Sequence, residues 1–304
     1  MKISSVKIIF VILALFWWIP VASSARTITD QIDRAVELPE RISRVVSLAP
    51  SITEVVYSLG RQELLVGATL YSDDPPEAKL LPRVGSYVQL DLEKILALKP
   101  DLCLAIKDGN PRHTVERIMG MGIPVYVVDP KSLAGIIEMI SGLGALLGAG
   151  EKAAMITSDM RKRIKAVHER LAGAHARPGV FFQIDAEPIV SAGPGTFIHE
   201  LITTAGGRNL AGEGAVGSYP KFSWEDILGY QPEVAIVASM AGGFSVEALK
   251  AGWFRWPQIP AVKNNRVHVI DAALVDRPTP RLIDGLETFA GIIHPEIFGE
   301  LVAK

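Results

Sequence analysis

Three tyrosines of this chain of 304 residues stand in loops, where a side chain is free to meet a ligand. Tyr71, Tyr87 and Tyr219 each lie near a proline or a glycine, outside the apolar repeats that mark core positions. A tyrosine offers a flat apolar face and a polar tip, which suits contact with a large planar ligand. The alternative interpretation is that each ring covers a neighbouring hydrophobic core.

A charged pair adds to these candidates. Asp276-Arg277 precedes Pro278 and closely follows a predicted strand at 267–271, which places the pair to reach a cleft. Asp73-Asp74 precedes two prolines and could bind a cation, but an acidic pair in that position is more typical of a turn.

The sequence carries none of the common catalytic signatures: no G-x-S-x-G elbow, no P-loop, no H-E-x-x-H and no C-x-x-C. Its six histidines are scattered. Only His168 and His175 share a helix face, and their spacing indicates no metal site. Cys103 is the single cysteine and lies in an apolar run, which is typical of a buried, inert thiol and leaves no partner for an internal disulfide. We therefore expect no catalytic residue, no metal and no cofactor.

One long helix, predicted at 150–173, divides the chain. Ala153, Ile156 and Met160 begin an apolar stripe with steps of three and four, and no proline or internal glycine interrupts it. A flexible linker would be rich in Gly, Ser or Pro. We interpret this segment as a rigid strut between two lobes; the alternative is an ordinary surface helix within one domain.

Each half shows short apolar strands that alternate with helices. This pattern predicts an α/β fold with two similar lobes, mostly parallel sheets and a ligand cleft between the lobes. Near the start of the first lobe, Ser51 and Glu54 have the spacing of a capping box for a helix that runs to Gly60.

The two halves also contain an internal sequence repeat. The stretch 92–101 matches 224–233, since in each a Glu opens a short helix and a Pro-acid pair precedes an apolar strand. The stretches 122–129 and 264–271 match in the same order, which favours a duplicated lobe. Glu93 and Glu225 occupy equivalent positions, where the helix dipole favours a carboxylate.

The N-terminus has the three parts of a secretory signal peptide. Lys2 and Lys7 precede an apolar run at 8–19, and the small residues at 23–25 predict cleavage after Ala25. The run is too short for a membrane span. We therefore divide the chain into a signal peptide at 1–25, lobes at 26–149 and 174–304, and the linking helix at 150–173. A net charge of -2 gives no argument for nucleic acid, and we expect a soluble, exported, monomeric protein.

Several stretches resemble one known family. RVVSLAPSITEVVYSLG, VGATLYSDDPPEA and DLEKILALKPDLCLA are similar to the periplasmic substrate-binding proteins of ABC importers for vitamin B12, haem and ferric siderophores. HELITTAGGRNL, FSWEDILGYQPEVAIV and DRPTPRLIDGLE continue the resemblance over nearly the whole mature chain. Family members have two α/β lobes joined by one rigid helix, and the Tyr-Ser-Asp-x-Pro-Pro segment resembles the B12 branch most.

The resemblance implies a corrinoid ligand in the cleft, touched by Tyr71, Tyr87, Tyr219 and Arg277. The best-known B12 binder has tryptophan at the positions of Tyr87, Tyr219 and Ile106, so the aromatic cage is thinner here. Haem is the second candidate and a ferric siderophore the third, while an enzyme that cradles a metallocofactor is less favoured. The resemblance further implies that Glu93 and Glu225 each dock on one subunit of a permease dimer in the inner membrane, which makes the protein periplasmic.

Overall fold

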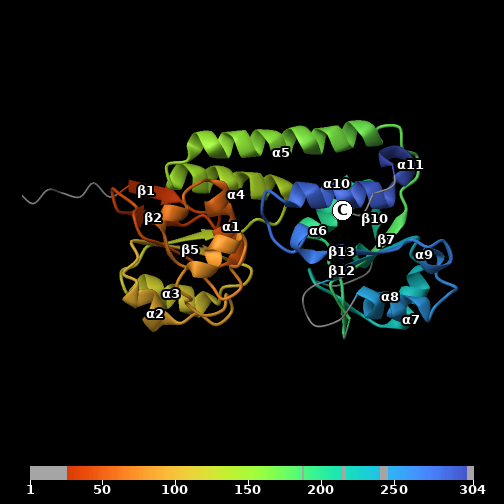
Figure 1. Ribbon diagram of the computed structural model, residues 1–304, viewed down its shortest axis with the longest axis horizontal. Helices are drawn as coiled ribbons and strands as arrows, with labels where there is room; N and C mark the ends of the chain where they lie inside the picture. Colours follow the sequence, from red (N-terminus) through yellow and green to blue (C-terminus); the bar gives the residue numbers. More distant parts are fainter. Residues whose placement is uncertain (1–25, 187, 214–216, 240–245, 300–304) are drawn as a thin grey trace, which may run out of the picture.

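The computed structural model describes residues 26–186, 188–213, 217–239 and 246–299, so the predicted signal peptide lies outside the described residues. The chain forms two α/β lobes side by side, with the long helix α5 (Gly150–Leu171) running along one side of both (Figure 1). None of the helices within these described ranges is long and apolar enough to cross a bilayer.

The first lobe is built on a parallel sheet of four strands in the order β4-β3-β5-β6. The strands are β3 (Val45–Ser47), β4 (Leu65–Gly67), β5 (Leu102–Ile106) and β6 (Val125–Val128). β5 and β6 are buried along their whole length, as expected for a parallel sheet that is covered on both faces.

Helices connect these strands and cover the sheet. They are α1 (Pro50–Ser58), α2 (Leu92–Ala97), α3 (Arg112–Gly120) and α4 (Leu133–Leu146), with the short 3-10 helices η1 (Gln62–Leu64) and η2 (Pro76–Leu80). An antiparallel hairpin of β1 (Arg26–Thr29) and β2 (Ala35–Leu38) precedes the lobe.

The second lobe also has a parallel sheet of four strands, in the order β10-β7-β12-β13. These strands are β7 (Gly179–Gln183), β10 (Arg208–Asn209), β12 (Val234–Ser239) and β13 (Val267–Asp271). A small antiparallel sheet adds β8 (Asp185–Ala186), β9 (Ile189–Val190) and β11 (Lys221–Phe222).

The helices of this lobe resemble those of the first in placement. They are α6 (Phe197–Thr204), α7 (Trp224–Tyr230), α8 (Val246–Phe254), α9 (Pro260–Lys263), α10 (Leu282–Ile293) and α11 (Pro295–Phe298), with the 3-10 helices η3 (Leu210–Gly212) and η4 (Ala272–Leu274).

Strand order confirms that the two lobes are similar. If the strands of each parallel sheet are numbered along the chain, both sheets have the order 2-1-3-4. In each lobe a short helix, α2 or α7, leads into the third strand. The repeat of letters that starts at Glu93 and at Glu225 therefore marks the same step of the same topology.

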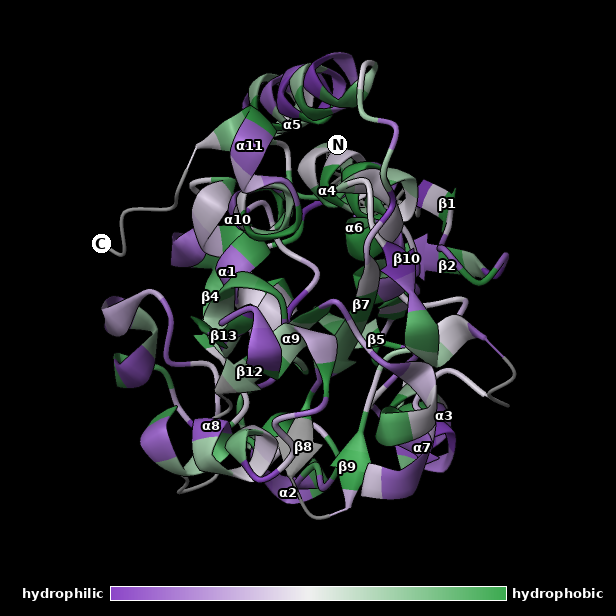
Figure 2. Ribbon diagram, turned by 90° about the vertical axis from the view of Figure 1, so that its right-hand side faces the viewer, coloured by the Kyte–Doolittle hydropathy of each residue, from purple (hydrophilic) through white to green (hydrophobic). Residues whose placement is uncertain are grey.

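The helix α5 carries the predicted apolar stripe but does not stand free. It packs on α4 in the first lobe and on α10 in the second, and one hydrophobic core cluster includes Ala153, Met160 and Val167 together with residues of both lobes. Figure 2 shows hydrophilic residues on its outer turns and hydrophobic ones on the strands below. Because α5 is one continuous helix packed along both lobes, it resists bending.

One local prediction was wrong. Ser51 lies inside α1 rather than at its N-cap, which is Ala49 and has no side-chain cap bond. Glu54 instead forms an ion pair with Arg281 of the second lobe. The capping-box spacing is local, whereas the partner of Glu54 is 227 residues away, so the sequence window could not reveal it.

Candidate functional site between the lobes

The first lobe has a topological switch point where its strand order reverses, between β3 and β5. In open α/β sheets, ligands bind outside the carboxyl ends of the strands at such a point. The segment 107–110 follows β5 directly, and the chain after β3 begins at Leu48.

Asn110 ties this edge together. Its side-chain Nδ2 donates to the carbonyl oxygens of Leu48 and Tyr87, both at 2.8 Å, and its Oδ1 accepts from the backbone N–H of Ile106 at 2.8 Å. Asn110 is buried, so each of these bonds replaces water on a polar group that would otherwise be unsatisfied. One side chain thus fixes the ends of β3 and β5 and the loop that carries Tyr87.

The Tyr71 loop is held just as firmly. Ser72 N–H donates to Thr69 O at 3.1 Å, which closes a turn that exposes Leu70 and Tyr71 at its tip. A guanidinium N–H of Arg83 donates to both Thr69 O and Ser72 O, at 2.7 and 2.9 Å. Tyr71 is 59% exposed, so the turn presents a tyrosine that neighbouring side chains leave largely uncovered.

Behind this turn lies a buried cluster of hydroxyl groups. Thr53 Oγ1, in α1, lies 3.1 Å from Ser72 Oγ and 2.8 Å from Ser47 Oγ, and Thr69 Oγ1 lies 2.9 Å from Ser72 Oγ. All four side chains are fully buried. This network anchors the turn to the first turns of α1.

Tyr219 belongs to the second lobe, but residues of the first lobe affect its pKa. Its pKa is raised, mainly because part of the ring is buried, and further by the carboxylate of Asp108 and by Tyr87. These two residues belong to the first lobe, so the structure brings Tyr219 and Tyr87 to one region from opposite sides. Tyr219 is 45% exposed and Tyr87 is 36% exposed.

Arg277 and Asp276 complete the site from the second lobe. Arg277 lies 3.6 Å from the Asp276 carboxylate and 3.8 Å from that of Asp73 in the first lobe, and its side chain is 21% exposed. Burial raises the pKa of Asp276, and the positive charge of Arg277 lowers it in part. We call the set Tyr71, Tyr87, Asp108, Tyr219, Asp276 and Arg277 the inter-lobe site.

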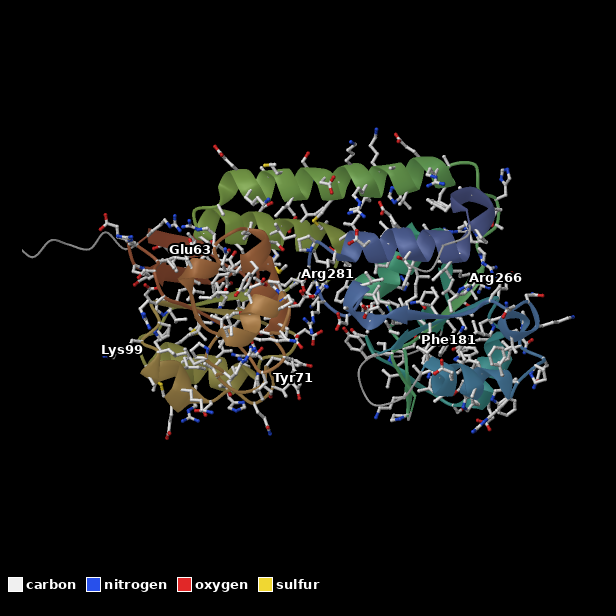
Figure 3. The ribbon with its side chains drawn as sticks, viewed as in Figure 1. Glu63, Tyr71, Lys99, Phe181, Arg266 and Arg281 are labelled. Carbon is white, nitrogen blue, oxygen red and sulfur yellow. The ribbon has the colours of Figure 1, made fainter. Side chains whose placement is uncertain are left out.

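The prediction that Asp73-Asp74 is merely turn chemistry misses its role across the lobes. Asp74 pairs with Arg281 at 2.6 Å, and Figure 3 shows Arg281 and Tyr71 both on the side of their lobes that faces the other lobe. A separate cavity of about 350 Å³ lies between α5 and α10 and is lined by Met155, Ile156, Asp159, Met160, Arg163, Pro280, Arg281 and Asp284. It contains none of the predicted ligand-binding residues.

Sequence reasoning also missed Asp108 and Asn110. Both follow β5 directly, and the carboxyl end of a buried parallel strand is the local signal that could have found them. Within the described part of the chain, no group of three His, Cys, Asp or Glu side chains could hold a metal ion. Cys103 is buried in β5, which raises the pKa of its thiol to about 12.

The predicted docking residues Glu93 and Glu225 lie away from this site. Each is exposed and is the second residue of its helix, α2 or α7. Figure 1 shows these helices at the end of each lobe opposite α5. The helices are capped by other side chains, Asp91 and Ser223.

Known proteins resemble this chain in sequence and in fold. The vitamin B12-binding protein of Vibrio cholerae is 34% identical over 254 residues, which cover 82% of this chain and 88% of that protein. The crystal structure of the periplasmic vitamin B12 binding protein of Vibrio cholerae superposes with a TM-score of 0.70 at 32% identity, covering 83% of this chain and 96% of that one. A periplasmic haem-binding protein from Pseudomonas aeruginosa superposes with a TM-score of 0.75 at 27% identity, covering 84% and 94%.

The resemblance noted in the sequence and the two lobes seen in the structure thus agree. The model of the periplasmic binding protein family matches residues 45–274, and the chain belongs to that family.

Proposed function

We propose that this protein binds one corrinoid of the vitamin B12 type between its lobes and delivers it to an ABC transporter permease. The observation that carries the proposal is the identity of 34% to a vitamin B12-binding protein over 82% of the chain. The inter-lobe site supports it, because three partly exposed tyrosines from two lobes offer apolar faces and polar tips to a large ring.

The charges of the site favour a corrinoid over haem. Arg277 is flanked by two carboxylates, those of Asp73 and Asp276, and Asp108 adds a third near Tyr219. The edge of a corrin ring carries neutral amides, which can accept from Arg277 and donate to the carboxylates. Haem carries two propionates, which would meet these carboxylates, while Arg277, the cation of the named inter-lobe set, already lies between two of them.

Haem remains the second candidate, because the haem-binding protein of Pseudomonas aeruginosa superposes over 84% of the chain. Titration of the purified mature protein with cyanocobalamin, haemin and a ferric siderophore, followed by visible absorbance and calorimetry, separates the candidates. We expect one corrinoid per chain. A spectral change with haemin and no heat with any corrinoid would refute the proposal.

In this proposal, Glu93 and Glu225 dock the protein on the permease that receives the corrinoid. Two similar lobes present two similar carboxylates at the same end of the molecule, which suits a partner with twofold symmetry such as a permease dimer. We further propose that the chain acts as a monomer in the periplasm after cleavage at Ala25, without catalytic activity, and that its domains are residues 26–149 and 174–304 joined by 150–173.

A further inference from the structure

Arg281 crosses from one lobe to the other. It is the N-cap residue of α10 in the second lobe, yet its guanidinium donates to both carboxylate oxygens of Glu54 in α1 of the first lobe, at 2.7 and 2.6 Å. The same guanidinium lies 2.6 Å from the carboxylate of Asp74. One side chain therefore bridges two points of the first lobe.

The Glu54 end of this bridge is buried. The side chain of Glu54 is 7% exposed and that of Arg281 is 32% exposed. A two-pronged arginine–carboxylate contact fixes both orientation and distance, which a lysine cannot do. The contact with Glu54 is also the main cause of the raised pKa of Arg281.

The Asp74 end of the bridge continues into the Tyr71 turn. Asp74 is three residues after Tyr71, and between them Ser72 is anchored through Thr53 to the first turn of α1. Glu54 is the next residue of α1 after Thr53. The turn and Arg281 are therefore held by adjacent residues of one helix.

On the second lobe, Arg281 stands four residues after Arg277. The segment between them is short, and Thr279 N–H donates to Arg277 O at 2.9 Å while Leu282 N–H donates to Thr279 O at 3.1 Å. Arg277 itself meets the first lobe only loosely, at 3.8 Å from Asp73. Of these two arginines, Arg281 therefore makes the closer contacts with the first lobe.

We propose that Arg281 is a positioning residue for ligand binding: by holding Glu54 and Asp74, it keeps Tyr71 of the first lobe in register with Arg277 of the second. Its effect on the ligand passes through these two residues. The inference rests on the proposed corrinoid function, because Tyr71 and Arg277 are ligand residues only in that proposal.

The test uses the mature protein and cyanocobalamin as the probe. Asp74→Asn removes the charge that pairs Arg281 with the Tyr71 turn but leaves the ion pair of Glu54 and Arg281 intact. Arg281→Lys keeps the positive charge but cannot bond both carboxylate oxygens of Glu54 in the same planar geometry. We expect each to raise the Kd by about tenfold, the order of one charge-assisted hydrogen bond, with a nearly unchanged Tm for Asp74→Asn. Since Arg281→Gln leaves Glu54 buried without a partner and can unfold the chain, the double variant Glu54→Gln/Arg281→Gln replaces it.

Arg163→Gln is the matched control. Arg163, in α5, lines the same cavity as Arg281 and pairs with Asp284 and Glu287 of α10. Among the residues that the structure describes, it forms no hydrogen bond or ion pair with the Tyr71 turn. We expect it to lower the Tm and leave the Kd unchanged. A Kd that is also unchanged in Asp74→Asn and Arg281→Lys would overturn the proposal.

A second measurement needs no ligand. The N–H of Ser72 donates to Thr69 O within the Tyr71 turn, and the N–H of Leu70 donates from the turn to Gly85 O. We expect faster hydrogen exchange at these amides in Asp74→Asn and Arg281→Lys than in the wild type or Arg163→Gln, and equal rates would overturn the proposal. If the wild type binds no corrinoid, the proposed function fails, while this exchange experiment still decides whether Arg281 holds the turn.

Discussion

The ring of Tyr87 lies directly against the backbone of Gly109. A Cβ atom at Gly109 would stand 2.9 Å from Cδ2 of Tyr87, and Gly109 has φ of +139°. The next residue, Asn110, holds the carbonyl of Tyr87 at 2.8 Å. The end of β5 therefore positions both the backbone and the ring of Tyr87, and only glycine leaves room for that ring.

Gly109→Ala tests this relationship. The new methyl group meets the ring and the backbone conformation is strained, so we expect a loss of stability of about 1–3 kcal/mol and a weaker affinity for cyanocobalamin because Tyr87 is displaced. Calorimetry and thermal unfolding measure the two effects. Gly60→Ala is the control, since Gly60 has φ of +69° and nothing within 4 Å of its Cβ position; it should lose stability and keep its affinity. Equal affinities for the two variants would contradict the role of Tyr87.

The architecture could be predicted because its signals are local. The apolar run at Leu102–Ile106 and the stripe along Gly150–Leu171 each depend on a single window of sequence, and both elements form where the pattern places them. The sequence repeat that contains Glu93 and Glu225 was likewise visible in the amino-acid sequence, and the matching strand orders of the two sheets confirm it.

The interior of the site could not be predicted, because its contacts join distant residues. Asn110 bonds Leu48, 62 residues away, and Glu54 bonds Arg281, 227 residues away. No period or motif relates such positions. A tyrosine in a loop is visible in the sequence, whereas the buried amide or guanidinium that fixes the loop appears only when the chain is folded.

Asp276 gives the inter-lobe site a pH-dependent stability. Its folded pKa is raised above the ordinary value, mainly by burial, so the folded state binds the proton more tightly than the unfolded state. Its contribution to stability is present below the unfolded pKa and is lost as the pH rises through the folded pKa. We therefore expect Asp276→Asn to have a higher Tm than the wild type at neutral pH, with the difference shrinking on acidification. Thermal unfolding across the acid range measures this, and a difference independent of pH would refute it.

The linking helix predicts a small closure on ligand binding. Glu200 of α6 accepts a hydrogen bond from the N–H of Leu133 at the start of α4, which links the lobes in addition to the packing of α5 and the ion pairs of Arg281. Binding proteins hinged on flexible strands close by large rotations, whereas here the core cluster continues across both lobes. Small-angle scattering with and without cyanocobalamin should give nearly equal radii of gyration. A large decrease would show that the lobes move despite α5.

Glu93 and Glu225 are exposed carboxylates that do not cap the helices on which they lie. Asp91 caps α2, and Ser223 and Asp226 form the capping box of α7, so helix capping does not account for either glutamate. Within the described ranges, neither side chain forms an ion pair or a side-chain hydrogen bond, and both are exposed. Two unpaired carboxylates at equivalent places of two lobes are free to meet cations of a symmetric partner. Charges of this kind set orientation and encounter rate more than raw affinity.

We therefore expect Glu93→Ala and Glu225→Ala to leave the Kd for cyanocobalamin unchanged and to reduce its uptake by cells or vesicles that contain the permease. Each single variant should lose about tenfold if one charge pair contributes ~1.5 kcal/mol, and the double variant, which removes two pairs, should lose more. Glu151→Ala is the matched control, because Glu151 is also exposed and also the second residue of its helix, α5, but lies on the opposite side of the molecule. Its uptake should equal that of the wild type, since a carboxylate on that side cannot reach a permease docked at α2 and α7. Normal uptake by the double variant at wild-type protein levels would assign both glutamates to the helix dipole alone.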